Sequence, residues 1–437
     1  MKILLLLPDG RIHKVQIGSL TRSLREAPLT MTLLAALVPA ELQAEITLID
    51  ESIDRVPADG VFDLVAISVM TGTSHGAYRW ADHFRARGAK VVLGGVHVTL
   101  RPEEAAQHAD VIVKGFAERT WPQLLRDHAA GHLQASYHDP EVHLQNLPMP
   151  RRDFQKPFGY MMPSTVFATR GCKGKCDFCT IPAADFGWHT RPVAEVIDEL
   201  RRTPARRLAF NDVSITEDRE YAKELFTAMI PLKKKWGGLC TTRIAEDEEL
   251  LDLMTRSGCR YMLIGFESLN APSLQGIQKG FNRPAAYADL MRKMHARRIL
   301  IQGCFIFGFD HDGPSVFQDT VAMVDELKID IPRYAIYTPY PGTAAYHRLK
   351  GEQRLLHENW RHYDTQHVVF RPSQMSPEQL DAGFRWAHTR TFRLGSMVHR
   401  TLAAGIWFPV AFVGNLAYRR YTRRLQADTE RILTGPA

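Results

Sequence analysis

The segment that decides this fold is Thr169-Arg-Gly-Cys-Lys-Gly-Lys-Cys-Asp-Phe-Cys-Thr180. It places three thiols, Cys172, Cys176 and Cys179, at C-x₃-C-x₂-C spacing in a loop that contains two glycines. Thiols at this spacing can bind three irons of a 4Fe–4S cluster, which leaves the fourth iron without a protein ligand. An open coordination position lets a metal centre take part in chemistry, whereas a closed one only stabilises a fold. We therefore expect a catalytic iron–sulfur site in this loop.

Two other interpretations of the loop remain open at this point. A structural zinc ion would need a fourth ligand, and the nearest downstream histidine is His189, with no second cysteine pair nearby. The thiols could also be unrelated core residues. A disulfide would need an oxidising compartment. The other cysteines, Cys240, Cys259 and Cys304, lie in or beside strand-like segments, where we expect ordinary core thiols.

Upstream of the loop, residues 1 to about 135 alternate between apolar runs and helical stretches. This alternation predicts a flavodoxin-like, doubly wound parallel sheet over residues 1–137. Ligands of such sheets bind at the carboxyl ends of the strands, and small residues at those ends allow close approach of the backbone. The same small residues are also needed for the turns. The predicted strands are Ile3–Leu7, Ile46–Ile49, Leu64–Val69, Val91–Leu93 and Val111–Val113.

The first of these strands could be mistaken for an export signal. Its apolar run is only five residues long, and polar Asp9 follows closely. Export signals have apolar regions of 7 to 15 residues. We therefore expect a cytoplasmic protein, in which thiols remain reduced.

Downstream, a polar and proline-rich linker covers 138–163, and strand–helix alternation resumes with a longer period over 164–351. Six strand–helix units in this length predict a partial (β/α)₆ barrel, because a closed barrel needs eight. The cysteine loop follows the first barrel strand, at the carboxyl end where barrel active sites are built. The predicted strands are Thr165–Ala168, Arg207–Asn211, Gly238–Arg243, Tyr261–Phe266, Leu300–Phe307 and Tyr334–Tyr337.

The C-terminal region, 352–437, is expected to be a mostly helical appendage. A strand-and-loop lid is predicted at Trp360–Phe370 and a helix at Pro377–Phe392. Residues 401–418 then carry no charge and contain a central proline and two glycines, which makes a poor membrane span. Two interpretations stay open: a segment that lies in the interface of an anionic membrane, and a buried helix flanked by arginines.

The distribution of charge supports a local basic segment. The formal net charge is +7, and 390–424 contains seven arginines and no acidic residue. Apart from these seven, 48 basic residues balance 48 acidic ones. We therefore expect no nucleic-acid partner, since that surface would be basic more widely.

Taken together, several segments resemble a known family. The cysteine loop with Phe178, placed on a partial barrel, is similar to the radical SAM superfamily. A flavodoxin-like domain in front of it resembles the branch with an N-terminal cobalamin-binding domain, including hopanoid methylases and the anaerobic magnesium-protoporphyrin ester cyclase. The matching segments are Val92–Leu100, Pro150–Asp153, Phe210–Asp212, Ile264–Leu269, Phe305–Asp310 and Thr338–Thr343.

The resemblance implies that Cys172, Cys176 and Cys179 hold a 4Fe–4S cluster whose open iron binds S-adenosylmethionine. Reductive cleavage of that molecule would give a 5′-deoxyadenosyl radical, which is chemistry of the cofactors. By similarity, the S-adenosylmethionine contacts are Phe178 in the loop, Asn211 and Asp212 at the amino end, Arg243 at the carboxylate, Glu267 at the ribose, and Phe307 and Gly308 at the adenine.

The resemblance also implies cobalamin at the strand ends of the first domain. The candidate contacts are Ser68, Thr71, Gly94, Gly95 and Gly115. Two departures from the family pattern bear on this. No D-x-H-x-x-G motif occurs in 1–135, so cobalamin would be held without a histidine ligand. Phe116 and Val213 stand where relatives often have acidic residues.

The predicted function is cobalamin-dependent methylation of an unactivated carbon in a lipid, polyprenoid or tetrapyrrole. The alternatives are a radical SAM oxidative cyclase and a cobalamin-binding protein without catalysis. A methylthiotransferase would need three further cysteines upstream, and residues 1–171 contain none. The resemblance implies a flavodoxin- or ferredoxin-type electron donor, and 390–424 suggests a peripheral position on the inner face of the membrane. The sequence singles out no catalytic side chain.

Overall fold

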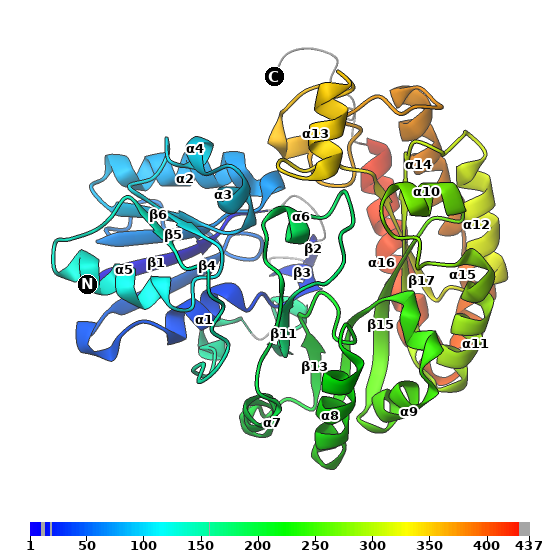
Figure 1. Cartoon of the computed structure of the whole chain (residues 1–437), viewed down its shortest axis with the longest axis horizontal. Helices are drawn as coiled ribbons and strands as arrows, with labels where there is room; N and C mark the ends of the chain where they lie inside the picture. Colours follow the sequence, from blue (N-terminus) through cyan, green and yellow to red (C-terminus); the bar gives the residue numbers. More distant parts are fainter. Residues whose placement is uncertain (10–13, 18–19, 157, 428–437) are drawn as a thin grey trace. The chain divides into compact units, whose positions relative to one another are not determined.

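A computed structural model describes residues 1–9, 14–17, 20–156 and 158–427. The chain divides into two compact units (Figure 1). Unit 1 comprises Met1–Arg170 and Ala183–Asn211, and unit 2 comprises Gly171–Pro182 and Asp212–Ala437.

Unit 1 is built on a parallel sheet with the order β4-β1-β5-β6-β7-β8. Its first five strands in this order are the five predicted apolar runs, in the 2-1-3-4-5 arrangement of flavodoxin-like folds. The sixth strand, β8, adds one edge at the end of the predicted domain. The strands are β1 (Lys2–Leu7), β4 (Glu45–Asp50), β5 (Leu64–Ser68), β6 (Lys90–Gly94), β7 (Val111–Lys114) and β8 (Ser136–His138).

Helices cover both faces of this sheet because successive strand residues point to opposite sides. Leu4 and Leu6 of β1 belong to a core that includes Phe84 of α2. Ile3 and Leu5 belong to a second core, with α1 and α5. Figure 1 shows α2, α3 and α4 on one side of the sheet and α1 and α5 on the other. These helices are α1 (Thr30–Ala36), α2 (Ser74–Ala86), α3 (Val96–Leu100), α4 (Pro102–Ala105) and α5 (Thr120–Ala129).

The rest of unit 1 includes short strands that the sequence did not predict. An antiparallel hairpin, β2–β3, pairs with β9. The first two predicted barrel strands appear as β10 and β13, which pair in parallel. The elements are β2 (Lys14–Ile17), β3 (Leu20–Glu26), β9 (Tyr160–Met162), β10 (Thr165–Val166), β12 (Trp188–Thr190), β13 (Arg207–Phe210) and α7 (Val193–Arg202). Two further elements, β11 (Thr169–Gly171) and α6 (Thr180–Ala183), include the positions along the chain where one unit gives way to the other.

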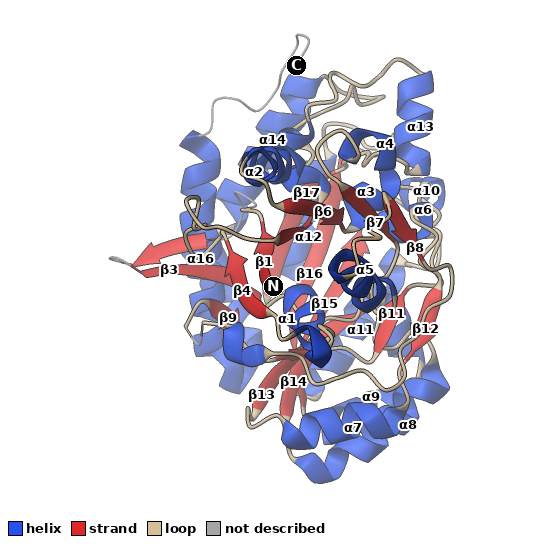
Figure 2. Cartoon of the chain, turned by 90° about the vertical axis from the view of Figure 1, so that its left-hand side faces the viewer, coloured by secondary structure: helices blue, strands red, loops and turns tan. Residues whose placement is uncertain are grey.

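Unit 2 contains four parallel strands in the order β14-β15-β16-β17, with helices between them (Figure 2). Three of them match the prediction closely. The predicted strand Gly238–Arg243 instead runs from Lys235 to Cys240, so Arg243 falls in a following 3₁₀ helix, η5. The elements are β14 (Lys235–Cys240), β15 (Cys259–Glu267), β16 (Leu300–Phe307), β17 (Ile331–Ile336), η5 (Thr242–Glu246), α8 (Arg219–Met229), α9 (Glu248–Arg256), α10 (Ala271–Gly276), α11 (Tyr287–Ala296), α12 (Val316–Glu326) and α13 (Ala344–Gly351).

The C-terminal region is helical apart from the predicted lid. Within 360–370 the structure has a 3₁₀ turn, η7, and a single antiparallel bridge from Leu355 to Phe370. The predicted helix at 377–392 is α14. Residues 428–437 lie outside the described part. The helices are η7 (Trp360–His362), α14 (Pro377–Thr391), α15 (Leu394–Thr401), η8 (Leu402–Trp407) and α16 (Phe408–Ala427).

Candidate functional site

The three loop cysteines line a cavity of about 850 Å³ in unit 2. The cavity lies over the carboxyl ends of β14 and β15, and Cys304 of β16 also contributes to its wall. Five of the six cysteines of the chain line it. The lining also holds charged and aromatic side chains, among them Phe178, Arg243, Glu267, Lys279 and Phe281.

Backbone and side-chain contacts fix the cysteine loop. The Gly174 N–H donates to Cys172 Sγ (3.2 Å), a contact that favours the thiolate form. The Lys173 N–H donates to Glu217 Oε1 (3.2 Å), and its Nζ donates to Asp218 Oδ2 (3.0 Å) at the start of α8. The loop is therefore tied to the unit that carries the cavity.

Asp177, between the second and third cysteines, attaches the loop through both its backbone and its side chain. Its N–H donates to Ile277 O (3.3 Å), and its carbonyl accepts from the Ala345 N–H (3.0 Å). Its carboxylate accepts from Tyr337 Oη (2.6 Å) and lies 3.7 Å from Arg348 Nη2. Burial raises the pKa of Asp177, while Tyr337 and Arg348 act against that rise. A loop held at both its backbone and its side chain presents the three thiols in a fixed arrangement.

The environment of the thiols favours their protonated form. Burial raises the pKa of Cys172, Cys176 and Cys179, and for Cys176 to about 11. Lys279 lowers the pKa of all three, but less than burial raises it. Iron must therefore displace protons from these thiols when it binds. Among the described residues, no three His, Cys, Asp or Glu side chains converge as they would around one metal ion.

A buried ion pair forms another part of the cavity wall. Lys279 Nζ lies 2.5 Å from Glu267 Oε1, with the two side chains 12% and 9% exposed. Glu267 ends β15 at φ +64°, a left-handed conformation that is uncommon outside glycine. Burial lowers the pKa of Lys279, but Glu267 and the nearby thiols raise it by a larger amount, so the net shift of the pKa is upward. The ammonium group stays charged and fixes the Glu267 carboxylate at the cavity wall.

Arg243 lines the same cavity from η5. Its guanidinium lies 4.3 Å from the ring centroid of Phe281, a cation–π contact that orients the fork. Phe178 lines the cavity from the cysteine loop, with its ring 6.2 Å from that of Tyr337. Three of the predicted S-adenosylmethionine contacts, Phe178, Arg243 and Glu267, are therefore together with the cysteines.

The other four predicted contacts do not line the cavity. Asn211 ends the part of the chain assigned to unit 1, and its Nδ2 donates to Ala27 O (3.4 Å). Asp212 is buried. Phe307 is buried with its ring 4.9 Å from Phe317.

Gly308 follows the end of β16 at φ +99°, and Asp312 fixes this turn. The Asp312 carboxylate accepts from the N–H groups of Gly308 (3.1 Å) and Phe309 (3.0 Å) and from Ser273 Oγ (2.8 Å). Burial raises the pKa of Asp312 to about 6, against the lowering by these donors. The turn after β16 therefore depends on a buried carboxylate.

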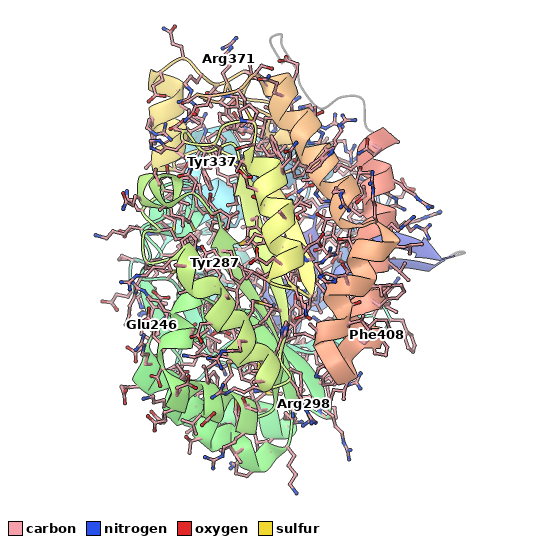
Figure 3. The ribbon with its side chains drawn as sticks, turned by 90° about the vertical axis from the view of Figure 1, so that its right-hand side faces the viewer. Glu246, Tyr287, Arg298, Tyr337, Arg371 and Phe408 are labelled. Atoms are coloured by element: carbon pink, nitrogen blue, oxygen red, sulfur yellow. The ribbon has the colours of Figure 1, made fainter. Side chains whose placement is uncertain are left out.

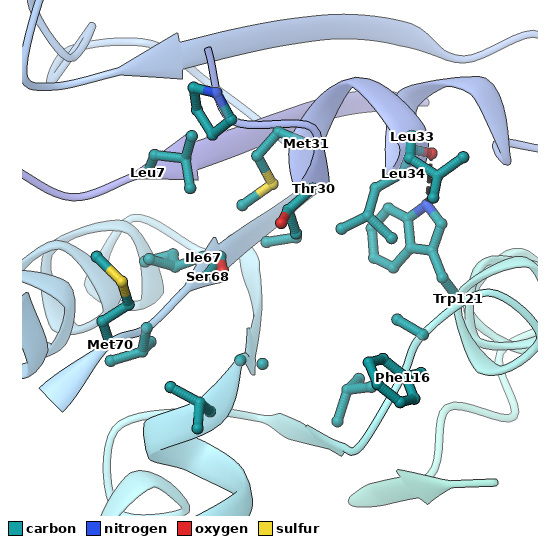
Figure 4. A pocket seen from close by; sticks show the side chains of 18 of the residues that line it. Leu7, Thr30, Met31, Leu33, Leu34, Ile67, Ser68, Met70, Phe116 and Trp121 are labelled. Atoms are coloured by element: carbon teal, nitrogen blue, oxygen red, sulfur yellow. Dashed lines mark hydrogen bonds between the residues drawn. The ribbon is translucent and has the colours of Figure 1, made fainter. Parts of the chain in front are cut away.

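A second cavity, of about 390 Å³, lies at the carboxyl ends of the unit 1 strands (Figure 4). Its lining is largely apolar. Figure 4 shows Leu7, Leu34 and Ile67 around it with the rings of Phe116 and Trp121. Trp121 Nε1 donates to Leu34 O (3.0 Å), which fixes the indole in the wall. No histidine is among the described residues that line this cavity.

Four of the five predicted cobalamin contacts line the second cavity: Ser68, Gly94, Gly95 and Gly115. Gly95 has φ +103°, and a Cβ atom there would lie 2.7 Å from Val69 O. A Cβ at Gly94 would meet nothing closer than 3.6 Å. Three glycines thus keep side chains off the strand ends, which suits a flat, largely apolar ligand.

The fifth predicted contact, Thr71, does not line the cavity. It is buried, with Oγ1 3.3 Å from His97 Nδ1. His97 is fully buried, and its Nε2 lies 3.2 Å from Glu104 Oε1. This pair connects the loop after β5 to α3 and α4, so His97 is a structural residue.

The sequence did not single out several residues that complete these sites. Lys279 and Asp312 have no distinctive neighbours in sequence, because their partners come from other elements. Asp177 could have been noted from its place between two cysteines.

Both parts of the chain that hold these cavities match known protein families. The B12 binding domain family matches residues 1–125, and the radical SAM superfamily matches residues 166–324. Bacteriochlorophyllide d C-12(1)-methyltransferase from Chlorobaculum tepidum is 32% identical over 419 residues, 92% of this chain and 90% of the relative. The chain belongs to the cobalamin-dependent radical SAM methyltransferases. A second relative in this family, bacteriochlorophyllide d C-8(2)-methyltransferase from the same organism, is 28% identical over 80% of this chain and 82% of its own.

A solved structure supports the fold of this methyltransferase. TsrM from Kitasatospora setae, a radical S-adenosylmethionine methyltransferase with cobalamin and a 4Fe–4S cluster bound, aligns with a TM-score of 0.69 at 15% identity. The alignment covers 97% of this chain and 99% of TsrM. The predicted fold class, a doubly wound sheet followed by a partial barrel and a helical C-terminal region, is confirmed.

The predicted resemblance is also confirmed, at lower identity, for the two groups named from the sequence. The anaerobic magnesium-protoporphyrin IX monomethyl ester cyclase of Cereibacter sphaeroides is 21% identical over 70% of this chain and 56% of its own. The hopanoid C-2 methylase of Rhodopseudomonas palustris is 23% identical over 49% and 43%. As a member of the family, this methyltransferase uses a 4Fe–4S cluster, S-adenosylmethionine and cobalamin.

Proposed function

We propose that this enzyme transfers a methyl group to an unactivated carbon at the periphery of a tetrapyrrole. The observation that supports this chemistry most directly is the unit 2 cavity. The three loop thiols line it together with the Arg243 guanidinium and the buried Glu267–Lys279 ion pair. The substrate class is supported by the two bacteriochlorophyllide methyltransferases, which align over most of the chain. The hopanoid methylase aligns over only half of it.

We assign Cys172, Cys176 and Cys179 as ligands of three irons. When bound, the cluster supplies the electron that cleaves S-adenosylmethionine to a 5′-deoxyadenosyl radical. The protein holds the thiols in place through Asp177 and through the Gly174 N–H contact to Cys172.

We assign the S-adenosylmethionine contacts to the residues that face the cysteines. Arg243, already oriented over Phe281, can bind the methionine carboxylate in bidentate fashion. Glu267, held by Lys279, can accept from the ribose hydroxyls. Phe178 supplies an apolar surface beside the loop.

The four predicted contacts outside the cavity have a different role in this proposal. Phe307 and Gly308 end β16, and the turn there is fixed by Asp312. Asn211 and Asp212 follow β13. We propose that these residues shape the ends of barrel strands and do not contact S-adenosylmethionine from the cavity wall.

In unit 1, Ser68, Gly94, Gly95 and Gly115 would hold cobalamin against the strand ends. Because no described lining residue is a histidine, the cobalt would have no imidazole ligand from this cavity. The apolar wall, including Trp121 and Phe116, would exclude water from the corrin face.

We further propose a flavodoxin- or ferredoxin-type electron donor and a cytoplasmic enzyme that acts at the inner face of the membrane. An apolar macrocycle partitions into lipid, so contact of 390–424 with a membrane surface would bring the enzyme to its substrate.

The test is an anaerobic assay with bacteriochlorophyllides and S-adenosylmethionine that carries a deuterated methyl group. We expect a deuterated methyl product with S-adenosylhomocysteine and 5′-deoxyadenosine in equal amounts. A product made with 5′-deoxyadenosine but without S-adenosylhomocysteine would instead identify an oxidative cyclase. Arg243→Met should raise the KM for S-adenosylmethionine, whereas Arg256→Met, an exposed residue of α9, should leave it unchanged.

A further inference from the structure

The C-terminal helices carry a series of exposed apolar side chains, here called the stripe. Along α15, η8 and α16, seven large apolar side chains are exposed at steps of three or four residues. Before and after the kink at Gly405, this is the spacing of one helix face. Leu402 and Ile406 are 64% and 63% exposed. Across the described residues, thirteen large apolar side chains are exposed, so this segment holds more than half of them. The seven are Leu394, Val398, Leu402, Ile406, Val410, Val413 and Leu416.

Exposed arginines lie near both ends of the stripe. Arg390 is in the last turn of α14, just before the extended residue Arg393 that precedes α15, and Arg420 lies on α16, four residues after Leu416. Both are exposed, as is Arg424, a further four residues on. No acidic residue lies between 390 and 424. An apolar stripe with cationic ends matches the interface of an anionic bilayer, where acyl chains lie beneath negatively charged head groups.

The buried face of these helices packs against the rest of unit 2. Arg400 is 0% exposed, and its guanidinium donates to Asp325 Oδ1 (2.8 Å), Thr391 O (3.0 Å) and Asn415 Oδ1 (2.9 Å). Asn415 Nδ2 in turn donates to Asp330 O (2.7 Å), at the start of β17. These contacts attach both α15 and α16 to the barrel.

This attachment decides between lying on a membrane and crossing it. By length and composition, Leu394–Ala427 could cross a membrane, with a most apolar window of mean hydropathy 1.4. Crossing would expose the buried Arg400 and Asn415 to lipid without their partners, which is strongly unfavourable. The chain also kinks within η8, at Gly405 (φ +54°). Figure 3 views this side of unit 2, with Phe408 at the start of α16.

We propose that α15, η8 and α16 form an in-plane docking element that inserts its apolar stripe into one leaflet of an anionic membrane. The inference builds on the proposed membrane contact and is independent of methyl transfer, because an inactive enzyme would dock equally well. A second copy of the chain fits the stripe less well, since pairing two stripes would bring like-charged arginines together.

The experiment is co-sedimentation of the full-length protein with vesicles. One set contains phosphatidylcholine alone, and the other contains phosphatidylcholine with anionic phosphatidylglycerol. We expect binding mainly to the anionic set. Leu402→Ser/Ile406→Ser/Val410→Ser should lower the partition coefficient by about 100-fold or more, since each change removes an inserted aliphatic side chain. The matched control, Val61→Ser/Phe158→Ser/Met161→Ser, replaces exposed apolar residues of unit 1 and should bind as the unchanged protein does.

The charge component has its own variant. Arg390→Gln/Arg420→Gln should weaken binding to anionic vesicles by about 25-fold, at about fivefold per arginine, and leave weak binding to neutral vesicles unaltered. Absence of binding to anionic vesicles would overturn the proposal. So would a stripe variant that binds normally, or a dimer in sedimentation velocity that the stripe variant abolishes, which would assign the stripe to a second copy.

Discussion

Replacing Lys279 by methionine should show how much the buried Lys279–Glu267 ion pair contributes to the free energy of unfolding. Lys279 and Glu267 are 2.5 Å apart and about one tenth exposed, so the substitution leaves an uncompensated carboxylate in a desolvated wall. Breaking such a pair costs about 3–5 kcal/mol, whereas exposed pairs contribute about 0–1 kcal/mol. Because both side chains border a cavity, we expect a loss near the lower figure, about 3 kcal/mol in the free energy of unfolding.

The assay is urea denaturation of the cluster-free protein, with a double-mutant cycle. Glu267→Gln/Lys279→Met removes both charges and should cost clearly less than the sum of the two single changes. Arg202→Met is the control, since Arg202 pairs with Asp198 at 2.8 Å on α7 and both side chains are more than half exposed, and it should cost about 1 kcal/mol at most. A Lys279→Met loss as small as that of the control, or strict additivity in the double variant, would refute the reasoning.

Three further predictions concern single contacts. Gly95→Ala should destabilise the protein by about 1–3 kcal/mol, because Gly95 has a positive φ and an added Cβ would contact Val69 O. Gly76→Ala, on α2 where a Cβ would meet open space, should instead stabilise the protein by about 0.5–1 kcal/mol, and thermal denaturation would compare the two variants. The folded pKa of Asp312, about 6, lies above its unfolded value, so the stability that this group contributes is present below about pH 4 and is lost as the pH rises through 6. In melting curves recorded between pH 4.5 and 7.5, Asp312→Asn should therefore gain stability relative to the unchanged protein. Arg400→Met should lower the free energy of unfolding by about 3–5 kcal/mol in urea denaturation, because Asp325 and Asn415 lose their shared partner.

The strands of unit 1 could be predicted because each is a continuous apolar run that is buried on both faces. Ile3–Leu6 is an example: alternate residues enter two different cores, and all four are fully buried. The hairpin β2–β3 could not be found in this way. Its sequences, KVQI and LTRSLRE, mix polar and apolar residues and lack the uninterrupted run that marks a central strand.

In the barrel, local sequence misplaced one strand and missed the supporting contacts. The predicted strand began at Gly238, yet Gly237 and Gly238 both lie within β14, where a Cβ at Gly237 would meet Tyr261 at 2.9 Å. Arg243 was predicted at a strand end and reaches the cavity from a 3₁₀ helix instead. Lys279 could not be assigned, because its significance depends on Glu267, which arrives from a separate strand. Spacing along the chain thus identified the cysteines, but the side chains around them depend on tertiary structure.

The measurement that tests the account most directly is the iron and cobalamin content per chain of anaerobically purified protein supplied with hydroxocobalamin. We predict about four irons and about one cobalamin in the unchanged protein. Cys176→Ala should lose most of its iron and keep its cobalamin. Gly94→Leu, which fills the other cavity, should lose cobalamin and keep its iron, and the buried Cys259→Ala should keep both. An unchanged protein without cobalamin, or a Cys176→Ala variant with a full complement of iron, would contradict the account.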